Sequence, residues 1–110
     1  MYKNHSEDIL KALESIAEIK ALTRGFPKSF EKLPCVAVSE ASNEVWSSFD
    51  NIDYAGNAEY YVRIFSKGIN DKIAEEVDRV LSEIGYARTF AYEDDNELVR
   101  QMLMRYRQIY

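Results

Sequence analysis

The chain has 110 residues, of which 46% are hydrophobic and 30% are charged, which excludes intrinsically disordered and collagen-like chains. This length fits one domain with its own core, so we expect a single domain over residues 1–110. The net charge is −5, whereas nucleic-acid-binding proteins usually carry a basic excess, so we expect no sequence-specific contact with DNA or RNA.

The first expected element is a helix over about 6–24. Apolar residues recur on one side of it at helical spacing, as Ile9, Leu13 and Ile16 do. Gly25 stands where a helix commonly ends, because glycine adopts the left-handed conformation at no steric cost.

A connector over 26–34 leads into a short strand over 35–40. The only cysteine of the chain, Cys35, opens this strand within an apolar stretch. We interpret it as a small buried hydrophobic residue. A nucleophilic cysteine would need a histidine partner, and the only histidine is His5, close to the first residue.

The segment 41–57 is rich in Ser, Asn, Asp and Gly, which favour turns and loops. It also holds large apolar residues, which are unusual in a solvated loop. We expect a long loop that is mobile in the free protein and orders on a partner, with Trp46 and Phe49 as anchors; Tyr54 is a further aromatic residue of the loop. The alternative is that these rings close one end of the core.

The second half of the chain alternates between strand and helix patterns. Apolar residues at every second position predict strands, and apolar residues three or four apart predict a helix. These patterns place strands over 60–66, 86–92 and 98–109 and a helix over 71–84. A helix is the alternative over 97–105, where the apolar spacing also fits helical periodicity.

Strands that come in adjacent pairs with local connections favour hairpins and an antiparallel sheet. We therefore expect an α+β two-layer sandwich with the element order α-β-β-α-β-β. It has a mainly antiparallel sheet of about four strands, with two helices on one face. No expected element then covers the other face of the sheet, so its role needs an explanation.

Charge is distributed unevenly along the chain. Residues 33–62 contain no Lys or Arg, and their acidic residues are Glu40, Glu44, Asp50, Asp53 and Glu59. Residues 98–110 contain no acidic residue, and their basic residues are Arg100, Arg105 and Arg107. This asymmetry is either ordinary surface variation or the basis of a head-to-tail contact between copies of the chain.

The sequence carries no signature of catalysis. A single His and a single Cys provide neither a zinc motif nor a catalytic triad, and the isolated glycines form no phosphate-binding loop. We expect no enzyme activity, no catalytic residues, no metal and no cofactor. We also expect no membrane span and no signal peptide, and synthesis in the cytoplasm.

Several short strings, taken with the order of elements, resemble a known family. The strings are Gly85-Tyr86-Ala87-Arg88-Thr89, Met104-Arg105-Tyr106-Arg107 after an acidic turn, Leu33-Pro34-Cys35-Val36, and Tyr60-Tyr61-Val62-Arg63-Ile64 followed by Lys67-Gly68. Over nearly its whole length the chain resembles the tail-completion proteins of long-tailed phages and prophages of Gram-positive bacteria. Those proteins are also described as tail terminators and as minor tail or tail-to-head joining proteins.

The resemblance implies a structural virion protein of the tail or neck. Such proteins are α+β sandwiches that close into a ring, typically of six copies. The ring caps the tail tube, ends its polymerisation and joins it to the head connector. The implied partners are further copies of the chain, the tail tube protein and a head-completion or connector protein.

The family provides no interface motif that maps onto single positions, so the interface residues are our own inference from aromatic and arginine content. They are Trp46, Phe49, Tyr54, Arg100, Arg105 and Arg107. The alternative function is a small cytosolic adaptor or regulatory module that binds a peptide or a metabolite. A monomer that binds a small ligand would favour this alternative.

Overall fold

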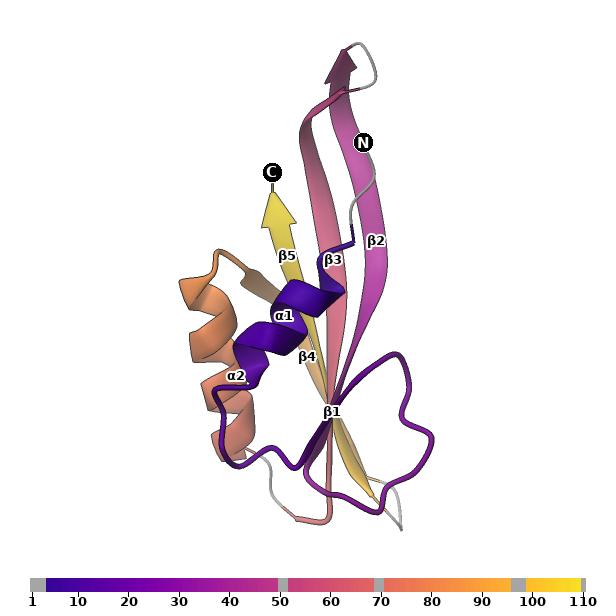
Figure 1. The fold of residues 1–110 in the computed structure, drawn as a ribbon, viewed down its shortest axis with the longest axis vertical. Helices are drawn as coiled ribbons and strands as arrows, with labels where there is room; N and C mark the ends of the chain where they lie inside the picture. Colours follow the sequence, from indigo (N-terminus) through magenta and orange to yellow (C-terminus); the bar gives the residue numbers. More distant parts are fainter. Residues whose placement is uncertain (1–3, 50–51, 69–70, 96–98, 110) are drawn as a thin grey trace.

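The structure is a computed structural model that describes residues 4–49, 52–68, 71–95 and 99–109. Within these residues the chain forms two helices and one five-stranded sheet (Figure 1). In chain order the elements are α1 (Ser6–Leu13), β1 (Ala21–Arg24), β2 (Cys35–Phe49), β3 (Ile52–Ser66), α2 (Asp71–Glu83), β4 (Ala87–Asp95) and β5 (Arg100–Ile109). The α+β class is confirmed, whereas the expected count of about four strands and the expected element order miss β1.

The sheet has the strand order β1-β2-β3-β5-β4. β1 pairs with β2 in parallel, and the other three pairs of neighbouring strands are antiparallel. Two of these antiparallel pairs, β2–β3 and β4–β5, consist of consecutive strands. The prediction of a mainly antiparallel sheet built from hairpins is therefore confirmed.

The first helix is shorter than its apolar spacing predicts. α1 ends at Leu13, and the residues expected to form its last turn belong to β1 instead. Residues 21–24 pair with the edge of β2 instead of continuing the helix. At the two ends of this pairing, Lys20 N donates to the Pro34 carbonyl oxygen at 2.8 Å and Gly25 N donates to the Val38 carbonyl oxygen at 2.8 Å. These hydrogen bonds come from a strand further along the chain, so helical periodicity in the segment itself cannot reveal them.

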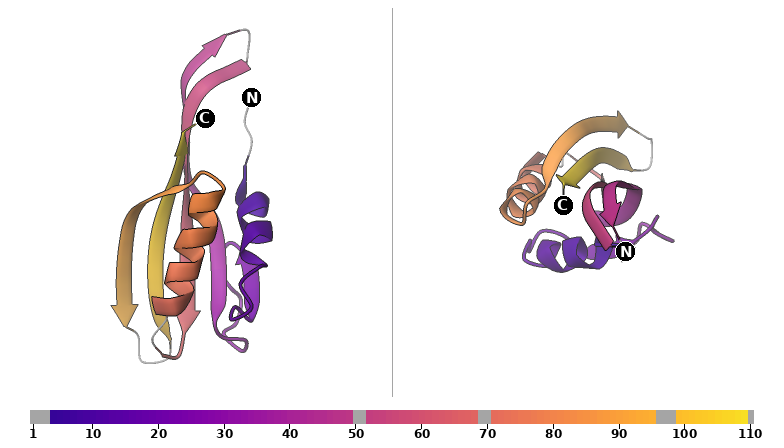
Figure 2. Two further views of the ribbon diagram at one scale, coloured as in Figure 1. Left: turned by 90° about the vertical axis from the view of Figure 1, so that its left-hand side faces the viewer. Right: turned by 90° about the horizontal axis from the view of Figure 1, so that it is seen from above.

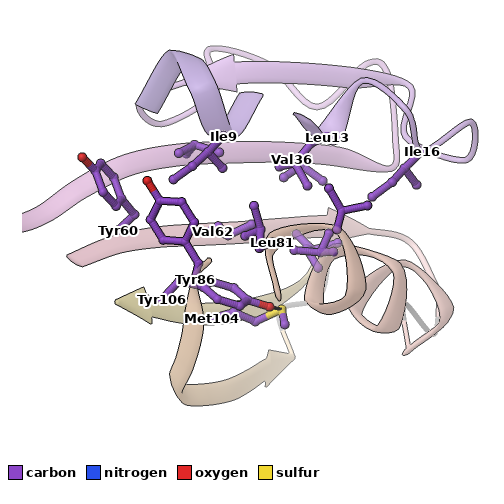
Figure 3. Close-up of a cluster of buried hydrophobic side chains, with 14 of the residues drawn as sticks. Ile9, Leu13, Ile16, Val36, Tyr60, Val62, Leu81, Tyr86, Met104 and Tyr106 are labelled. Carbon is purple, nitrogen blue, oxygen red and sulfur yellow. Dashed lines mark hydrogen bonds between the residues drawn. The ribbon is translucent and has the colours of Figure 1, made fainter. Parts of the chain in front are cut away.

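Both helices lie on the same side of the curved sheet and enclose the core with it (Figure 2). Apolar side chains of this sheet face align across the strands: Val36 with Ile64 and Met102, Val38 with Val62 and Met104, and Tyr60 with Tyr106. The helices add Ile9 and Leu13 from α1, and Ile73, Val77 and Leu81 from α2. Figure 3 shows part of this cluster, with Ile9, Leu13 and Leu81 from the helices facing Val36, Val62 and Met104 from the sheet. Each such buried side chain contributes about 1.5–3 kcal/mol, which is why this face is covered.

Two tyrosines bring hydroxyl groups into the core. The backbone N–H of His5 donates to the Tyr60 hydroxyl at 2.8 Å, and the Tyr106 hydroxyl donates to Asp78 Oδ1 at 2.9 Å. Burial raises the pKa of Tyr106, and the Asp78 carboxylate raises this pKa further. Burial likewise raises the pKa of Tyr86. The core therefore holds these phenols in their neutral form.

The loop expected over 41–57 is the largest error of the sequence prediction. β2 and β3 continue through this segment as a two-stranded ribbon, with pairs such as Glu44–Asn57 and Phe49–Ile52. Register shifts at three places along the ribbon accommodate its irregular sequence. Strand-forming Val, Trp, Phe, Ile and Tyr residues outweigh the turn formers between them. We call residues 41–49 and 52–56 the arm.

The arm projects beyond the rest of the sheet. β1 pairs with β2 only as far as Val38, and β5 pairs with β3 only as far as Asn57, so the arm has no third strand beside it in the described chain. It extends the molecule along its long axis, giving extents of 50 × 25 × 22 Å (Figure 1). The chain is thus a compact sandwich that presents one long hairpin.

Candidate protein-interaction surface

The sheet face that turns away from the helices is here called the open face. Its side chains follow from strand alternation, because the core residues occupy the opposite positions. Cross-strand rows on it are Glu59 with Arg107, Ser39 with Tyr61, Arg105 and Phe90, and Ala37 with Arg63, Leu103 and Tyr92. The open face thus combines arginines with large apolar side chains.

One end of the open face is covered by the connector between β1 and β2. Cys35, Ala37 and Phe65 are buried there against Phe30 and other partly buried residues. The Phe30 ring lies 5.0 Å from the Phe65 ring, and the Phe26 ring lies 5.4 Å from it. Burial raises the pKa of the Cys35 thiol. This confirms that Cys35 is a buried hydrophobic residue.

The rest of the open face stays solvent-accessible among the described residues. Phe90 is 43% exposed and Tyr92 is 55% exposed, and their rings stack at 6.4 Å with an interplanar angle of 12°. Tyr61 and Leu103 beside them are half-buried. We call the set formed by Tyr61, Arg63, Phe90, Tyr92, Leu103 and Arg105 the open-face patch. Contiguous apolar exposure of this kind marks interaction sites on folded domains.

The two arginines of the patch are held over aromatic rings. The guanidinium carbon of Arg63 lies 5.0 Å from the centroid of the Tyr61 ring, and that of Arg105 lies 5.6 Å from the centroid of the Phe90 ring. Arg63 Nη1 also donates to Ser39 Oγ at 3.1 Å. Side chains fixed in this way lose less conformational entropy when they bind a partner.

Arg105 has two further contacts that fix its position. Its Nε donates to Thr89 Oγ1 at 3.3 Å, and the same nitrogen lies 3.7 Å from Glu59 Oε2. The Arg105 side chain still keeps 37% of its surface exposed. Its charge is therefore only partly compensated within the chain, and it is oriented towards solvent on the open face.

The three arginines predicted as interface residues lie on two different faces of the sheet. Arg105 and Arg107 lie on the open face, and Arg107 is exposed. Arg100 occupies an alternate position of β5, in the same set as Met102 and Met104, so it lies on the helix-covered face. Its Nη1 lies 3.9 Å from Glu93 Oε1. Arg100 is therefore not part of the open-face patch.

The aromatic residues predicted from sequence belong to the arm. Trp46 and Phe49 stand in β2, and Tyr54 stands in β3. Their backbone positions are described, whereas their side chains lie outside the described part of the structure. The six predicted interface residues therefore do not form one cluster, because they fall on the arm, the open face and the helix-covered face.

Sequence reasoning did not single out Phe90 and Tyr92, the two exposed rings of the open-face patch. The 86–92 alternation predicts that Arg88 shares a face with both rings. A register shift between Arg88 and Phe90 instead leaves Arg88 opposite Tyr106 on the core side, with Phe90 opposite Arg105 on the open face. Such a bulge reverses the side-chain alternation, and period-two reading cannot detect it.

A hollow lies between α2, β4 and β5, with a volume of about 330 Å³. It is lined by Met102, Met104 and two alanines together with acidic side chains of α2 and with Arg88. Arg88 Nε lies 3.7 Å from Asp78 Oδ1. A hollow lined by both apolar and charged side chains can accept a side chain of a partner.

Within the described residues, no three His, Cys, Asp or Glu side chains lie close enough together to hold a metal ion. No helix in the described ranges is long and apolar enough to cross a membrane. In comparisons with known proteins, no family model and no curated protein matches this chain.

Proposed function

We propose that this chain is a structural assembly protein of a phage or prophage tail and neck. It forms a ring on the end of the tail tube, ends tube polymerisation and presents a surface to the head connector. The observation that carries the proposal is the open-face patch. Both helices cover one face of the sheet, and the other face exposes arginines and stacked aromatic rings to solvent. Trp, Tyr and Arg dominate the binding energy of protein interfaces.

The arm supports the same proposal. A specific protein interface takes about 20–30 residues on each side, which is more than the patch alone supplies. The arm adds a second, separate surface on the same chain. A protein with two separate contact surfaces can bind two neighbours at once, which a ring subunit must do.

The adaptor module is the second candidate, and the hollow between α2, β4 and β5 favours it. Its lining offers a place for one apolar side chain of a peptide. It offers neither the area nor the exposed aromatics of the open face. We therefore place the primary function on the open face and the arm.

The experiment is deletion of the gene from the phage or prophage that encodes it, followed by electron microscopy of the lysate. We expect headless tails of irregular, often excessive length, because nothing ends tube polymerisation. A plasmid copy of the wild-type gene is expected to restore uniform tails joined to heads. Intact particles with normal tails from the deletion strain would refute the proposal.

A further inference from the structure

We propose that the open-face patch binds the arm of a second copy of this chain, in a head-to-tail contact that repeats from copy to copy. This inference rests on the self-assembly part of the proposed function and names the partner of the surface. The occupant is identified by charge, by the geometry of the arm and by the apolar content of both surfaces.

The two surfaces have opposite charge. The arm contains Glu44 and Asp53 and no Lys or Arg, so its formal charge is −2. The open-face patch contains Arg63 and Arg105 and no acidic residue. Arg107 lies in the next row with Glu59, which also contacts Arg105. Complementary charge of this kind favours one orientation of docking and suppresses contacts between like surfaces.

The geometry requires a second copy. The arm continues β2 and β3, which are themselves strands of the sheet that bears the open face, and it leans towards the side of the helices (Figure 2). A hairpin of this kind cannot fold back onto its own sheet without breaking its register. Each copy therefore offers one arm and one patch to different neighbours. Such a heterologous contact closes into a ring when the rotation between copies permits.

Both surfaces also carry apolar content. The patch presents the stacked rings of Phe90 and Tyr92 beside half-buried Leu103. The arm brings Trp46, Phe49 and Tyr54 in its sequence. Charge alone gives weak, salt-screened contacts. Apolar groups on both sides allow the docked arm to remove surface from water.

The test is a reciprocal charge exchange in the full chain. The face variant combines Arg63→Glu with Arg105→Gln, since glutamate at position 105 would face Glu59. The arm variant combines Glu44→Arg with Asp53→Arg. Sedimentation at low salt, from micromolar to millimolar protein, measures association. Each variant alone is expected to associate at least about tenfold more weakly than the wild type.

An equimolar mixture of the two variants is the decisive measurement. A wild-type arm then meets a wild-type face, and a basic arm meets an acidic face, so the mixture is expected to regain association. The matched control is Arg100→Gln, in β5 on the helix-covered face, which is expected to associate like the wild type. Thermal unfolding of each variant establishes that it is folded.

Three outcomes would overturn the inference. The first is a wild type that stays monomeric over the whole range at low salt, and the second is a pair of variants that associate as well as the wild type. The third is a mixture that shows no recovery. If a single-stranded oligonucleotide binds the wild type but not the face variant, the patch takes nucleic acid instead of the arm. None of these outcomes involves tails, so the tail-completion proposal succeeds or fails separately in the deletion strain.

Discussion

At the residue scale, the clearest contrast lies between the aromatic side chains of the two sheet faces. Tyr60 and Tyr106 are fully buried and hydrogen-bonded in the core, whereas Phe90 and Tyr92 are largely exposed on the open face. Composition alone shows that the chain is rich in aromatics, and strand alternation separates them into two sets without showing which set is buried. The bulge in β4 assigns Phe90 to the open face, and only the structure reveals it.

This contrast predicts different consequences for substitution. Replacing Phe90 or Tyr92 with Ser is expected to change the free energy of unfolding by less than about 0.5 kcal/mol, as for exposed surface sites. Leu81→Ala in the core is expected to cost about 2–5 kcal/mol. Urea unfolding measures both. Self-association should weaken for Phe90→Ser and Tyr92→Ser, and a large loss of stability in either would place that ring in the core instead.

The buried tyrosines predict a pH dependence of stability. The pKa values of Tyr86 and Tyr106 are raised in the folded chain above the ordinary value near 10. Below pH 10 both states keep the phenolic protons, so the stabilisation is fully present. Above pH 10 the unfolded state loses protons that the folded state retains, so stability falls, by up to about 1.4 kcal/mol per pH unit for each tyrosine.

Urea unfolding between pH 8 and 11 checks this dependence. The matched control is the double variant Tyr86→Phe with Tyr106→Phe, which removes both titrating groups and is expected to show a clearly flatter profile. The variant also loses the hydrogen bond to Asp78, at a cost of about 1 kcal/mol at neutral pH. An equal decline with pH in the wild type and the double variant would contradict the assignment to these tyrosines.

At the element scale, local periodicity succeeds where one face of an element packs on the core. The helix predicted over 71–84 is α2. The strand predicted over 98–109 is β5, and Met104 and Tyr106 share one face of it, as alternation requires; this face packs on the core. Local patterns fail where pairing with a strand distant in sequence determines the secondary structure. Residues 21–24 have helical apolar spacing, but they form β1 because they pair with β2. The segment 41–57 has the composition of a loop, but it forms a ribbon because β2 pairs with β3 there.

The arm can be tested as an element separate from the fold. Replacing residues 42–58 by the two-residue turn Asn-Gly removes the ribbon and, among the buried core residues, only Ala58. We expect a cooperatively unfolding domain with a melting temperature close to that of the wild type, because the remaining core is untouched. Self-association should be lost. A shortened chain that fails to fold would show that the arm supports the core.

The candidate site was only partly predictable from sequence. Arginine and aromatic content made Arg105 and Arg107 interface candidates, and the structure places both on the open face of β5, the strand that hydrophobic alternation predicts. Arg100 was wrongly grouped with them, because a side chain two or four positions from Met102 or Met104 shares their face. The patch as a surface depends on the order of strands in the sheet, which no local pattern encodes.

At the scale of the whole molecule, the shape and the charges fit a subunit that contacts neighbours on two sides. The arm extends along the long axis, the open face lies on the body, and the two carry opposite charge. Association through such surfaces should weaken as salt rises, because screening shortens the range of charge interactions to about 8 Å at physiological ionic strength. Binding of the subunits to the end of a tail tube would hold them side by side and so offset the weaker self-association at physiological salt.

The measurement that tests this account most directly is electron microscopy of the wild-type protein incubated with purified tail tubes of its own phage. The account predicts one ring at one end of each tube, with sixfold symmetry in class averages, and no further growth when tube protein is added. The arm-shortened chain should leave the tube ends bare and growing. Tubes that keep growing in the presence of the folded wild-type protein, with no ring at either end, would contradict the account.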